Sequence, residues 1–265
     1  MFTLILLLIK DILKTRIHRG NNLLKILTAI FVSMFSLCSA QSVFSRADGG
    51  TMPKITSENI PYFVSIEDKS SSRDRVLHFH PNANLNKYPL FEYRAKMERI
   101  IPVTLNTKVP DFILDLPLRI VNDLHGRDSI TLRELSKGKI LVLDFWAKWC
   151  GPCLKSMQKW KELQPKFEKQ VQVVGLMADY DYKAELTIAE RGWQMPQLIG
   201  PEAIFMIAYF CGTPVVGPSA WIKDGYFIGV TDTKADCETV LENLVNNRID
   251  TIPEEAKWKF VVLEN

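Results

Sequence analysis

Two cysteines separated by two residues are the part of this sequence best suited to chemistry. Cys150 and Cys153 enclose Gly151 and Pro152. This spacing places both sulfurs within bonding reach, so the first thiolate can attack a disulfide and the second can resolve the mixed disulfide. The pair therefore predicts a redox-active dithiol, with Cys150 as the attacking group and Cys153 as the resolving group.

The elements around the pair favour that chemistry. An apolar run over Ile140–Phe145 indicates a strand, and a helix-period segment over Cys153–Lys169 follows it. A cysteine at a helix N-terminus has its thiolate stabilised by free N–H groups and by the helix dipole. Asp144, near the end of the strand, is expected to be buried beside the pair with a raised pKa, which suits it to accept a proton from Cys153. The alternative is a buried, hydrogen-bonded acid with no catalytic part.

Other uses of the pair fit the sequence less well. A zinc site would need a second pair of ligands, and the remaining cysteines after residue 40, Cys211 and Cys237, are far apart in the sequence. An inert disulfide would close too short a loop to contribute much chain-entropy stabilisation. We therefore expect neither a metal nor a cofactor. Cys211 and Cys237 either form a second, structural disulfide, if a hairpin brings them together, or remain separate buried thiols.

From Val109 onward the pattern is one of alternating strands and helices, which predicts an α/β fold with a central sheet covered on both faces. Asp224-Gly225 between two apolar runs indicates that the sheet ends in an antiparallel hairpin. Besides Ile140–Phe145, the expected strands are Val171–Met177, Ala220–Lys223 and Phe227–Thr231, and the later helices are Tyr182–Gly192, Glu202–Phe210 and Ala235–Asn247.

Residues 41–108 interrupt helix periodicity with scattered prolines and glycines, and they predict an irregular, β-rich extension of unknown role. The β-prone pieces are Tyr62–Ile66, Arg75–Phe79 and Ile100–Leu105. His78 and His80 would share one face of the second piece, but no further ligands stand at a metal-site spacing, so a solvated strand face is expected. Residues 249–265 form a short C-terminal tail.

Composition and charge limit the function classes. The 265 residues are 47% hydrophobic and 24% charged, which are globular proportions, and the net charge is +3. The basic excess lies in residues 1–40, so the remainder is not expected to bind nucleic acid. That leader joins basic residues to the apolar run Ile26–Leu37 and small residues near Ala40. It predicts a signal peptide or a retained membrane anchor, hence export to the periplasm in a soluble or tethered form.

The segment Leu143–Cys153 resembles the active-site segment of thioredoxins. Val109–Phe112, Thr131–Lys139 and Gly217–Gly225 are similar to the corresponding segments of the exported TlpA-like branch of that superfamily. The likeness covers about residues 109–248 and implies a thioredoxin-like central mixed sheet flanked by helices.

The resemblance also implies site residues. Pro218 would be a cis-proline facing Cys150, with Pro214 as the competing position, and the peptide before it would bind an extended substrate segment. Gly217 stands there, where the family commonly has a β-branched residue. Trp149 would line the substrate groove together with Gly151 and Pro152, and Trp146 would be a core aromatic.

The expected function is a thiol–disulfide oxidoreductase that reduces disulfides of exported proteins. Gly-Pro between the cysteines is the pair of reducing thioredoxins, whose potential is about −270 mV. The family implies a membrane thiol transporter as the electron donor. Two alternatives are a thiol peroxidase, for which Ala147 stands where a threonine is usual, and a thioredoxin-fold binding module without turnover.

Overall fold

The computed structural model describes residues 55–258, so the signal-peptide prediction for residues 1–40 lies outside the described residues. A seven-stranded mixed sheet runs in the order β4-β3-β7-β6-β5-β8-β9, and a separate antiparallel pair joins β1 to β2. The strands are β1 (Val64–Asp68), β2 (Phe91–Ala95), β3 (Leu118–Ile120), β4 (Ser129–Ile130), β5 (Ile140–Trp146), β6 (Val171–Met177), β7 (Gln197–Ile199), β8 (Ser219–Lys223) and β9 (Tyr226–Thr231).

Helices follow the strands in alternation, as the sequence predicts. They are α3 (Ile60–Phe63), α4 (Arg73–Phe79), α5 (Asp111–Leu114), α6 (Leu132–Ser136), α7 (Gly151–Leu163), α8 (Asp181–Arg191), α9 (Pro201–Cys211) and α10 (Cys237–Val245). Short 3-10 turns cover Ser70–Ser72, Met97–Arg99, Gln164–Phe167 and Glu254–Ala256. The thioredoxin-like α/β prediction is confirmed, with each expected strand and helix of the 109–248 region present, although α7 ends at Leu163 and a 3-10 turn replaces most of the rest of the helix predicted to reach Lys169.

The two central strands position the cysteine pair. β5 and β6 are parallel neighbours in which Trp146 pairs with Met177, so their carboxyl ends lie side by side. Both are almost entirely buried, because helices cover both faces of a parallel sheet. Successive side chains of a strand point to opposite faces of the sheet. Asp144 therefore faces the same side as Val142 and Trp146.

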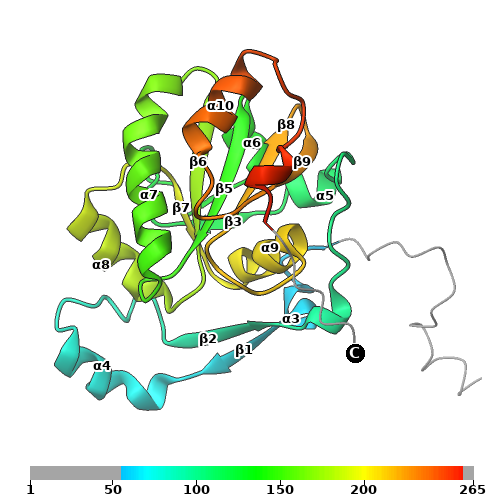
Figure 1. The fold of residues 1–265 in the computed structure, drawn as a ribbon. Coiled ribbons are helices and arrows are strands. Elements are labelled where there is room, and N and C mark those ends of the chain that lie inside the picture. Colours follow the sequence, from blue (N-terminus) through cyan, green and yellow to red (C-terminus); the bar gives the residue numbers. More distant parts are fainter. Residues whose placement is uncertain (1–54, 259–265) are drawn as a thin grey trace, which may run out of the picture. The chain divides into compact units, whose positions relative to one another are not determined.

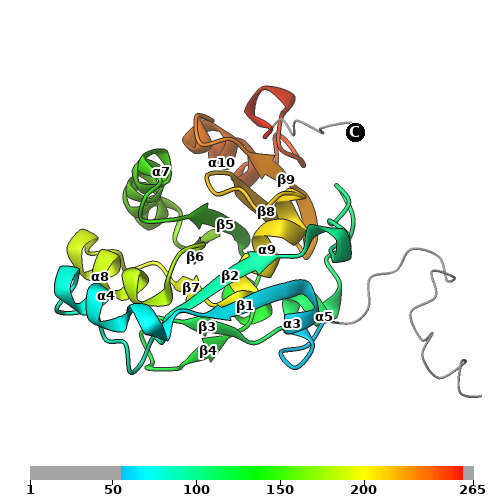
Figure 2. The ribbon, with the colours of Figure 1, turned by 90° about the horizontal axis from the view of Figure 1, so that it is seen from below.

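Helices fill the two faces with separate cores. α7, α8 and α10 pack on one face, and α3, α5, α6 and α9 pack on the other. Figure 2 shows the layers in order: α7 and α10, the strands β5 and β8, then α9, and finally β1 and β2. The cysteine pair lies on the face of the sheet that α7 covers.

Helix α9 is buried around its whole circumference. Its inner side packs on β3, β6 and β7, and its outer side is covered by α3, β1 and β2 of the N-terminal extension (Figure 1). Phe63 of α3 meets Phe205 edge to face at 5.6 Å between ring centroids. A helix that is apolar all round must be covered on all sides, which explains why the sequence PEAIFMIAYFC has no polar face.

The extension differs from its predicted strands. Arg75–Phe79 lies in helix α4, because the preceding 3-10 turn continues into it and the adjacent pair Val76 and Leu77 packs against the core of the α7 face. His78 is therefore on a helix rather than a strand. Ile100–Leu105 is irregular chain, whose Val103 N–H donates to the Tyr209 carbonyl of α9 at 3.0 Å instead of joining the sheet.

The sequence predicts one of the two strands in the antiparallel pair of the extension. Of Tyr62–Ile66, only the part from Val64 is in a strand, and the sequence did not predict β2. β2 pairs with β1 along its whole length, from Ala95 opposite Val64 to Phe91 opposite Asp68. The extension is therefore β-rich, as predicted, but through a different second strand.

Chain flanking the hairpin protects the last strand of the sheet. Thr107 and Asn106 exchange backbone hydrogen bonds with Phe227, and toward the other end of the strand Trp258 N–H donates to the Val230 carbonyl at 2.9 Å. An unprotected edge strand invites pairing with other chains. The start of the thioredoxin-like region and the C-terminal tail thus cover the β9 edge together.

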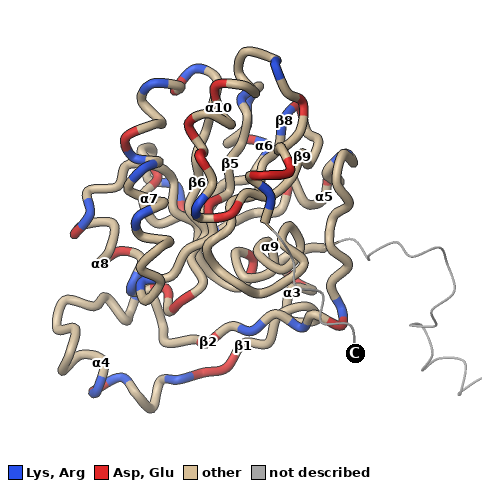
Figure 3. The backbone as a smooth tube through the Cα atoms, viewed as in Figure 1, with Lys and Arg blue, Asp and Glu red and all other residues tan. Residues whose placement is uncertain are grey.

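Charge and hydropathy of the described part are ordinary for a globular domain. Acidic and basic residues are interspersed along α8 and β2, whereas the charged residues of β1 are acidic and those of α7 are mostly basic (Figure 3). Within residues 55–258, none of the helices combines the length and the apolarity that a membrane span requires.

A buried carboxylate joins the extension to the α/β core. The Tyr93 hydroxyl of β2 donates to Asp181 Oδ2 at 2.9 Å, and Arg119 Nη1 of β3 donates to the same oxygen at 2.9 Å. Tyr93→Phe removes one hydrogen bond to a buried acid, so we expect it to lower the free energy of unfolding by about 1–2 kcal/mol. Urea unfolding measures this. Tyr226→Phe is the control, because its exposed hydroxyl has no partner within the described residues, and an equal loss in that variant would contradict the assignment.

Candidate functional site

Cys150 and Cys153 are joined by a disulfide, with their Cα atoms 5.3 Å apart. Cys150 is the N-cap residue of α7, and its Sγ accepts from the Cys153 N–H at 3.2 Å. Cys150 is partly exposed, whereas Cys153 is fully buried. The difference in access lets a large partner reach the first sulfur and leaves the second to react within the protein.

Gly151 and Pro152 occupy the first helical positions of α7 and are exposed. Pro152 has no backbone N–H, so its place in the first turn of α7 leaves no donor unpaired. Trp149, immediately before the pair, is 70% exposed. These three residues surround the accessible sulfur, in the place where a substrate chain would have to approach.

Asp144 is fully buried between β5 and α7, the helix that carries Cys153. Three donors from two elements converge on its Oδ2: Ser156 Oγ at 2.7 Å and Trp160 Nε1 at 2.8 Å from α7, and Ser219 Oγ at 2.9 Å from β8. Its Oδ1 has no partner within the described residues. Burial raises the pKa of Asp144 to about 6, although the three hydrogen bonds act in the opposite direction. An acid of this kind can hold a proton or release it near neutral pH.

The three donors were not identified from the sequence. Ser156 and Trp160 lie four residues apart on the face of α7 that carries Cys153, and Ser219 is the register partner of Asp144 across β5 and β8. A serine inside the otherwise apolar stripe of α7 was the available signal. The role of Ser156 depends on which strand residue lies opposite it, and only the folded structure shows which residue that is.

The segment before β8 departs from the expectation of a cis-proline. No cis peptide bond occurs within residues 55–258, so the bond before Pro218 is trans. Gly217 takes φ +123°, a region that residues with a side chain rarely adopt, and this turns the chain while the bond stays trans. The Gly217 N–H donates to the Phe145 carbonyl at 2.7 Å, and Phe145 N–H donates to the Pro218 carbonyl at 3.1 Å.

These two hydrogen bonds continue the β5–β8 ladder, so the Gly217 N–H is not available to a substrate in this structure. Gly217 and Pro218 are both buried, whereas Pro214 is exposed. Gly217 nevertheless borders the dithiol, because a Cβ at this position would lie 3.9 Å from Cys153 Sγ. Of the residues predicted to bind substrate, Trp149, Gly151 and Pro152 are exposed and Gly217 and Pro218 are buried, and their binding role stays a prediction.

Trp146 is a core residue. It is fully buried, its Nε1 donates to Gln197 Oε1 at 2.9 Å, and its ring meets Trp193 edge to face. These contacts fix the end of β5 from which the Cys150 loop departs.

Cys211 and Cys237 do not form the second disulfide that the sequence left open. Cys211 ends α9 on one face of the sheet, and Cys237 begins α10 on the other, so the sheet lies between them. Burial raises the pKa of the Cys237 thiol to about 12 and that of Cys211 further still. Both thiols are therefore protonated and poorly reactive at neutral pH.

A metal centre has no support in the described part of the chain. Residues 55–258 contain no group of three or more His, Cys, Asp or Glu side chains arranged to hold a metal ion. His80 instead lies beside Tyr182, with 5.7 Å between ring centroids.

Comparisons with known proteins agree with this geometry. The sequence profile of the AhpC/TSA family matches residues 105–224. The chain is 40% identical over 106 residues to a thiol-disulfide oxidoreductase ResA of Bacillus cereus, covering 39% of this chain and 57% of that one. It is 30% identical over 150 residues to ResA of Geobacillus kaustophilus, covering 54% of this chain and 79% of the relative.

Among solved structures, the solution structure of a putative protein disulfide isomerase from Bacteroides thetaiotaomicron is similar, with a TM-score of 0.43 and 22% identity over 55% of this chain and 89% of that one. The chain spans about half the length of the Bacillus relatives that it matches. It spans most of the Geobacillus relative, and its cysteine pair stands at the expected place in the fold. On these grounds the chain belongs to the thioredoxin superfamily, in the branch that contains the ResA-like thiol–disulfide oxidoreductases.

Proposed function

We propose that this protein is a thiol–disulfide oxidoreductase that reduces disulfides of exported proteins through Cys150 and Cys153. The observation that carries the proposal is the bonded pair at the N-terminus of α7, with one sulfur accessible and the other buried on the helix that also hydrogen-bonds a titratable acid, Asp144. This arrangement supplies an attacking group, a resolving group and a proton acceptor.

The reaction balances with the dithiol as the two-electron donor. The Cys150 thiolate attacks one sulfur of a substrate disulfide, forms a mixed disulfide and releases the first substrate thiolate. Asp144 accepts the Cys153 proton, and the Cys153 thiolate then attacks Cys150 Sγ, which releases the second substrate thiolate. The protein is left with the Cys150–Cys153 disulfide that the structure contains.

The proposal also includes export of the protein and re-reduction of its disulfide. The leader in residues 1–40 supports delivery to the periplasm, as a soluble or tethered protein. Because that compartment is oxidising, the dithiol must be regenerated there by a thiol donor, and a membrane thiol transporter is the donor that the superfamily branch implies.

A thiol peroxidase is less well supported. Ala147 stands three residues before Cys150 and offers no hydroxyl group to a peroxide, and its side chain is fully buried. We therefore do not propose peroxide reduction as a second activity.

Capture of mixed disulfides tests the proposed function. In Cys153→Ala the resolving thiol is missing, so the first step proceeds and the second does not. We expect this variant, expressed in cells, to accumulate covalent complexes with exported proteins that dithiothreitol releases and mass spectrometry identifies. Cys150→Ala is the matched control and should capture none. Equal capture by both variants, or none by Cys153→Ala, would contradict the proposal.

A further inference from the structure

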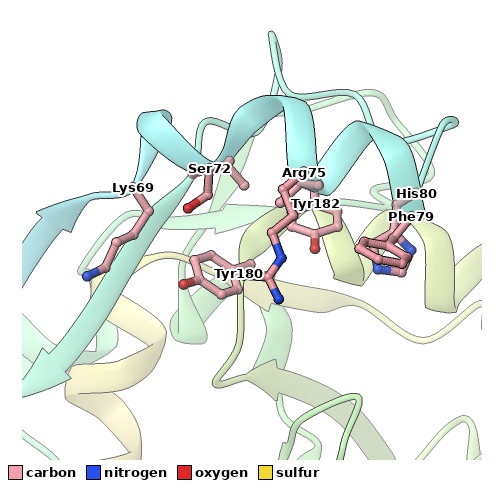
Figure 4. Close-up of a pocket in the computed structure, with 9 residues that line it drawn as sticks. Lys69, Ser72, Arg75, Phe79, His80, Tyr180 and Tyr182 are labelled. Carbon is pink, nitrogen blue, oxygen red and sulfur yellow. The ribbon is translucent and has the colours of Figure 1, made fainter.

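A cavity of about 280 Å³ lies between the N-terminal extension and the start of α8 (Figure 4). It has no part in the chemistry described above. Its walls come from α4 and the chain just before it, from the chain just before β2, from the loop between β6 and α8, and from the start of α8. Its lining residues are Lys69, Ser72, Arg75, Val76, Phe79, His80, Leu90, Tyr180 and Tyr182.

The cavity is rich in hydrogen-bond donors and has no carboxylate in its lining. Figure 4 shows the Arg75 side chain reaching from α4 toward the rings of Tyr180 and Tyr182. The Arg75 guanidinium and the hydroxyls of Ser72, Tyr180 and Tyr182 make no hydrogen bond or ion pair within residues 55–258. The guanidinium can only donate and carries a positive charge, and each hydroxyl can donate one further hydrogen bond, so this lining suits the oxygens of an anionic group.

The acids nearest the cavity do not compete for Arg75. Glu67 and Glu92 both pair with Lys69, and Asp179 pairs with Lys183 at 2.8 Å. The positive charge of Lys69 is therefore largely neutralised by Glu67 and Glu92. Arg75 is then the side chain that can offer an unpaired positive charge to a ligand. A planar guanidinium binds a carboxylate through two parallel hydrogen bonds.

The position of the cavity points to a polypeptide. Tyr180 and Tyr182 follow β6, and the Cys150 loop follows the neighbouring parallel strand β5, so both leave the same edge of the sheet. Ala178 N–H donates to the Trp146 carbonyl at 2.8 Å, so the chain that leads to Cys150 leaves the sheet beside the residue two positions before Tyr180. A protein bound at Cys150 would thus extend over the region that contains the cavity.

Size and wall chemistry agree with this choice. The cavity is slightly smaller than the roughly 300–1,000 Å³ of sites for whole small molecules, so one or two side chains fit it better than a free cofactor. Phe79, 67% exposed at its rim, and the two tyrosine rings provide apolar surface beside the cation.

We propose that this cavity is an accessory binding site for a glutamate or aspartate side chain of the protein that the dithiol reduces, with Arg75 as its main contact. The identity of the partner as substrate rests on the proposed function. The prediction that the cavity binds an acidic peptide does not depend on the proposed function.

A binding experiment tests the site without any redox step. The probes are an N-acetylated, C-amidated peptide of glutamate and leucine residues and its glutamine counterpart, titrated into the oxidised protein by calorimetry. We expect the glutamate peptide to bind and Arg75→Gln to weaken it on the order of tenfold, because a charge-assisted hydrogen bond contributes about that much. Arg73→Gln is the matched control: it removes the same charge from the same helix, but Arg73 bonds Asn86 outside the cavity lining.

Three results would overturn the site: no binding of the glutamate peptide, equal binding of the glutamine peptide, or equal weakening by Arg73→Gln. Sodium phosphate is a further arm. If phosphate alone is bound in an Arg75-dependent way and the peptide is not, the cavity takes a free oxyanion and the polypeptide assignment is wrong.

A kinetic experiment then separates this inference from the proposed function. The reduced protein is given disulfide-closed peptides with and without a glutamate-rich arm. We expect the ratio of their kcat/KM values to fall about tenfold in Arg75→Gln and to stay unchanged in Arg73→Gln. Reduction of neither peptide, with binding intact, would refute the proposed function alone. Equal kcat/KM for both peptides in the unaltered protein would refute the accessory site alone.

Discussion

Replacement of Cys150 by alanine is expected to lower the rate of disulfide reduction on the order of a thousandfold or more, because a protein without its nucleophile retains only what binding contributes to the rate. Cys150 contributes the only accessible sulfur of the bonded pair, and Cys153 is fully buried beneath it. The measurement is reduction of insulin by the dithiothreitol-reduced protein, followed by turbidity.

The control for this variant is Cys237→Ala. It also removes one thiol, but that thiol is buried at the start of α10 and its pKa is raised to about 12, so activity should remain close to that of the unaltered protein. Near-normal reduction by Cys150→Ala would show that another group performs the attack and would refute the assignment of the site.

Replacement of Asp144 by asparagine is expected to increase the stability of the oxidised protein at pH 8 by about 3 kcal/mol. Burial raises the folded pKa of Asp144 to about 6 from 3.8, so the folded state binds the proton more tightly than the unfolded chain does. Well below pH 3.8 the acid is protonated in both states, so its burial involves no charge. As the pH rises from about 4 to about 6, the unfolded state ionises first and stability falls, since each tenfold difference in proton affinity between the two states corresponds to about 1.4 kcal/mol.

Asparagine abolishes this loss, because its side chain stays neutral while its oxygen can still accept from Ser156, Trp160 and Ser219. Urea unfolding at pH 4 and pH 8 measures the difference. The stability gain of Asp144→Asn should be present in full at pH 8 and largely lost at pH 4. The exposed Asp128→Asn serves as the control and should change neither value. A gain that is the same at both pH values would show that ionisation of Asp144 is not its cause.

The sequence was sufficient for features that depend on local pattern. Ile140–Phe145 and Val171–Met177 are continuous apolar runs, and both are central parallel strands. The dithiol could be placed at the start of α7 because a strand, the cysteine pair and a helix-period segment follow one another directly. The apolar stretch of α9 could also be identified as a helix without knowledge of its surroundings.

Features that depend on distant contacts could not be predicted in this way. β3, β4 and β7 are two or three residues long, which is too short for periodicity to show. Arg75–Phe79 has β-prone residues, yet its packing in the extension makes it helical. The convergence of Ser156, Trp160 and Ser219 on Asp144 combines two elements more than sixty residues apart, and no local pattern carries that information.

The enclosure of α9 has a consequence for cooperativity. A helix whose outer side is covered by α3, β1 and β2 cannot keep its packing if those elements detach. Detachment would bare the rings of Phe205 and Tyr209 to water, and exposing each such side chain costs about 1.5–3 kcal/mol. Residues 55–108 and the catalytic core are therefore coupled, and the chain should melt in one transition rather than shedding its N-terminal part first.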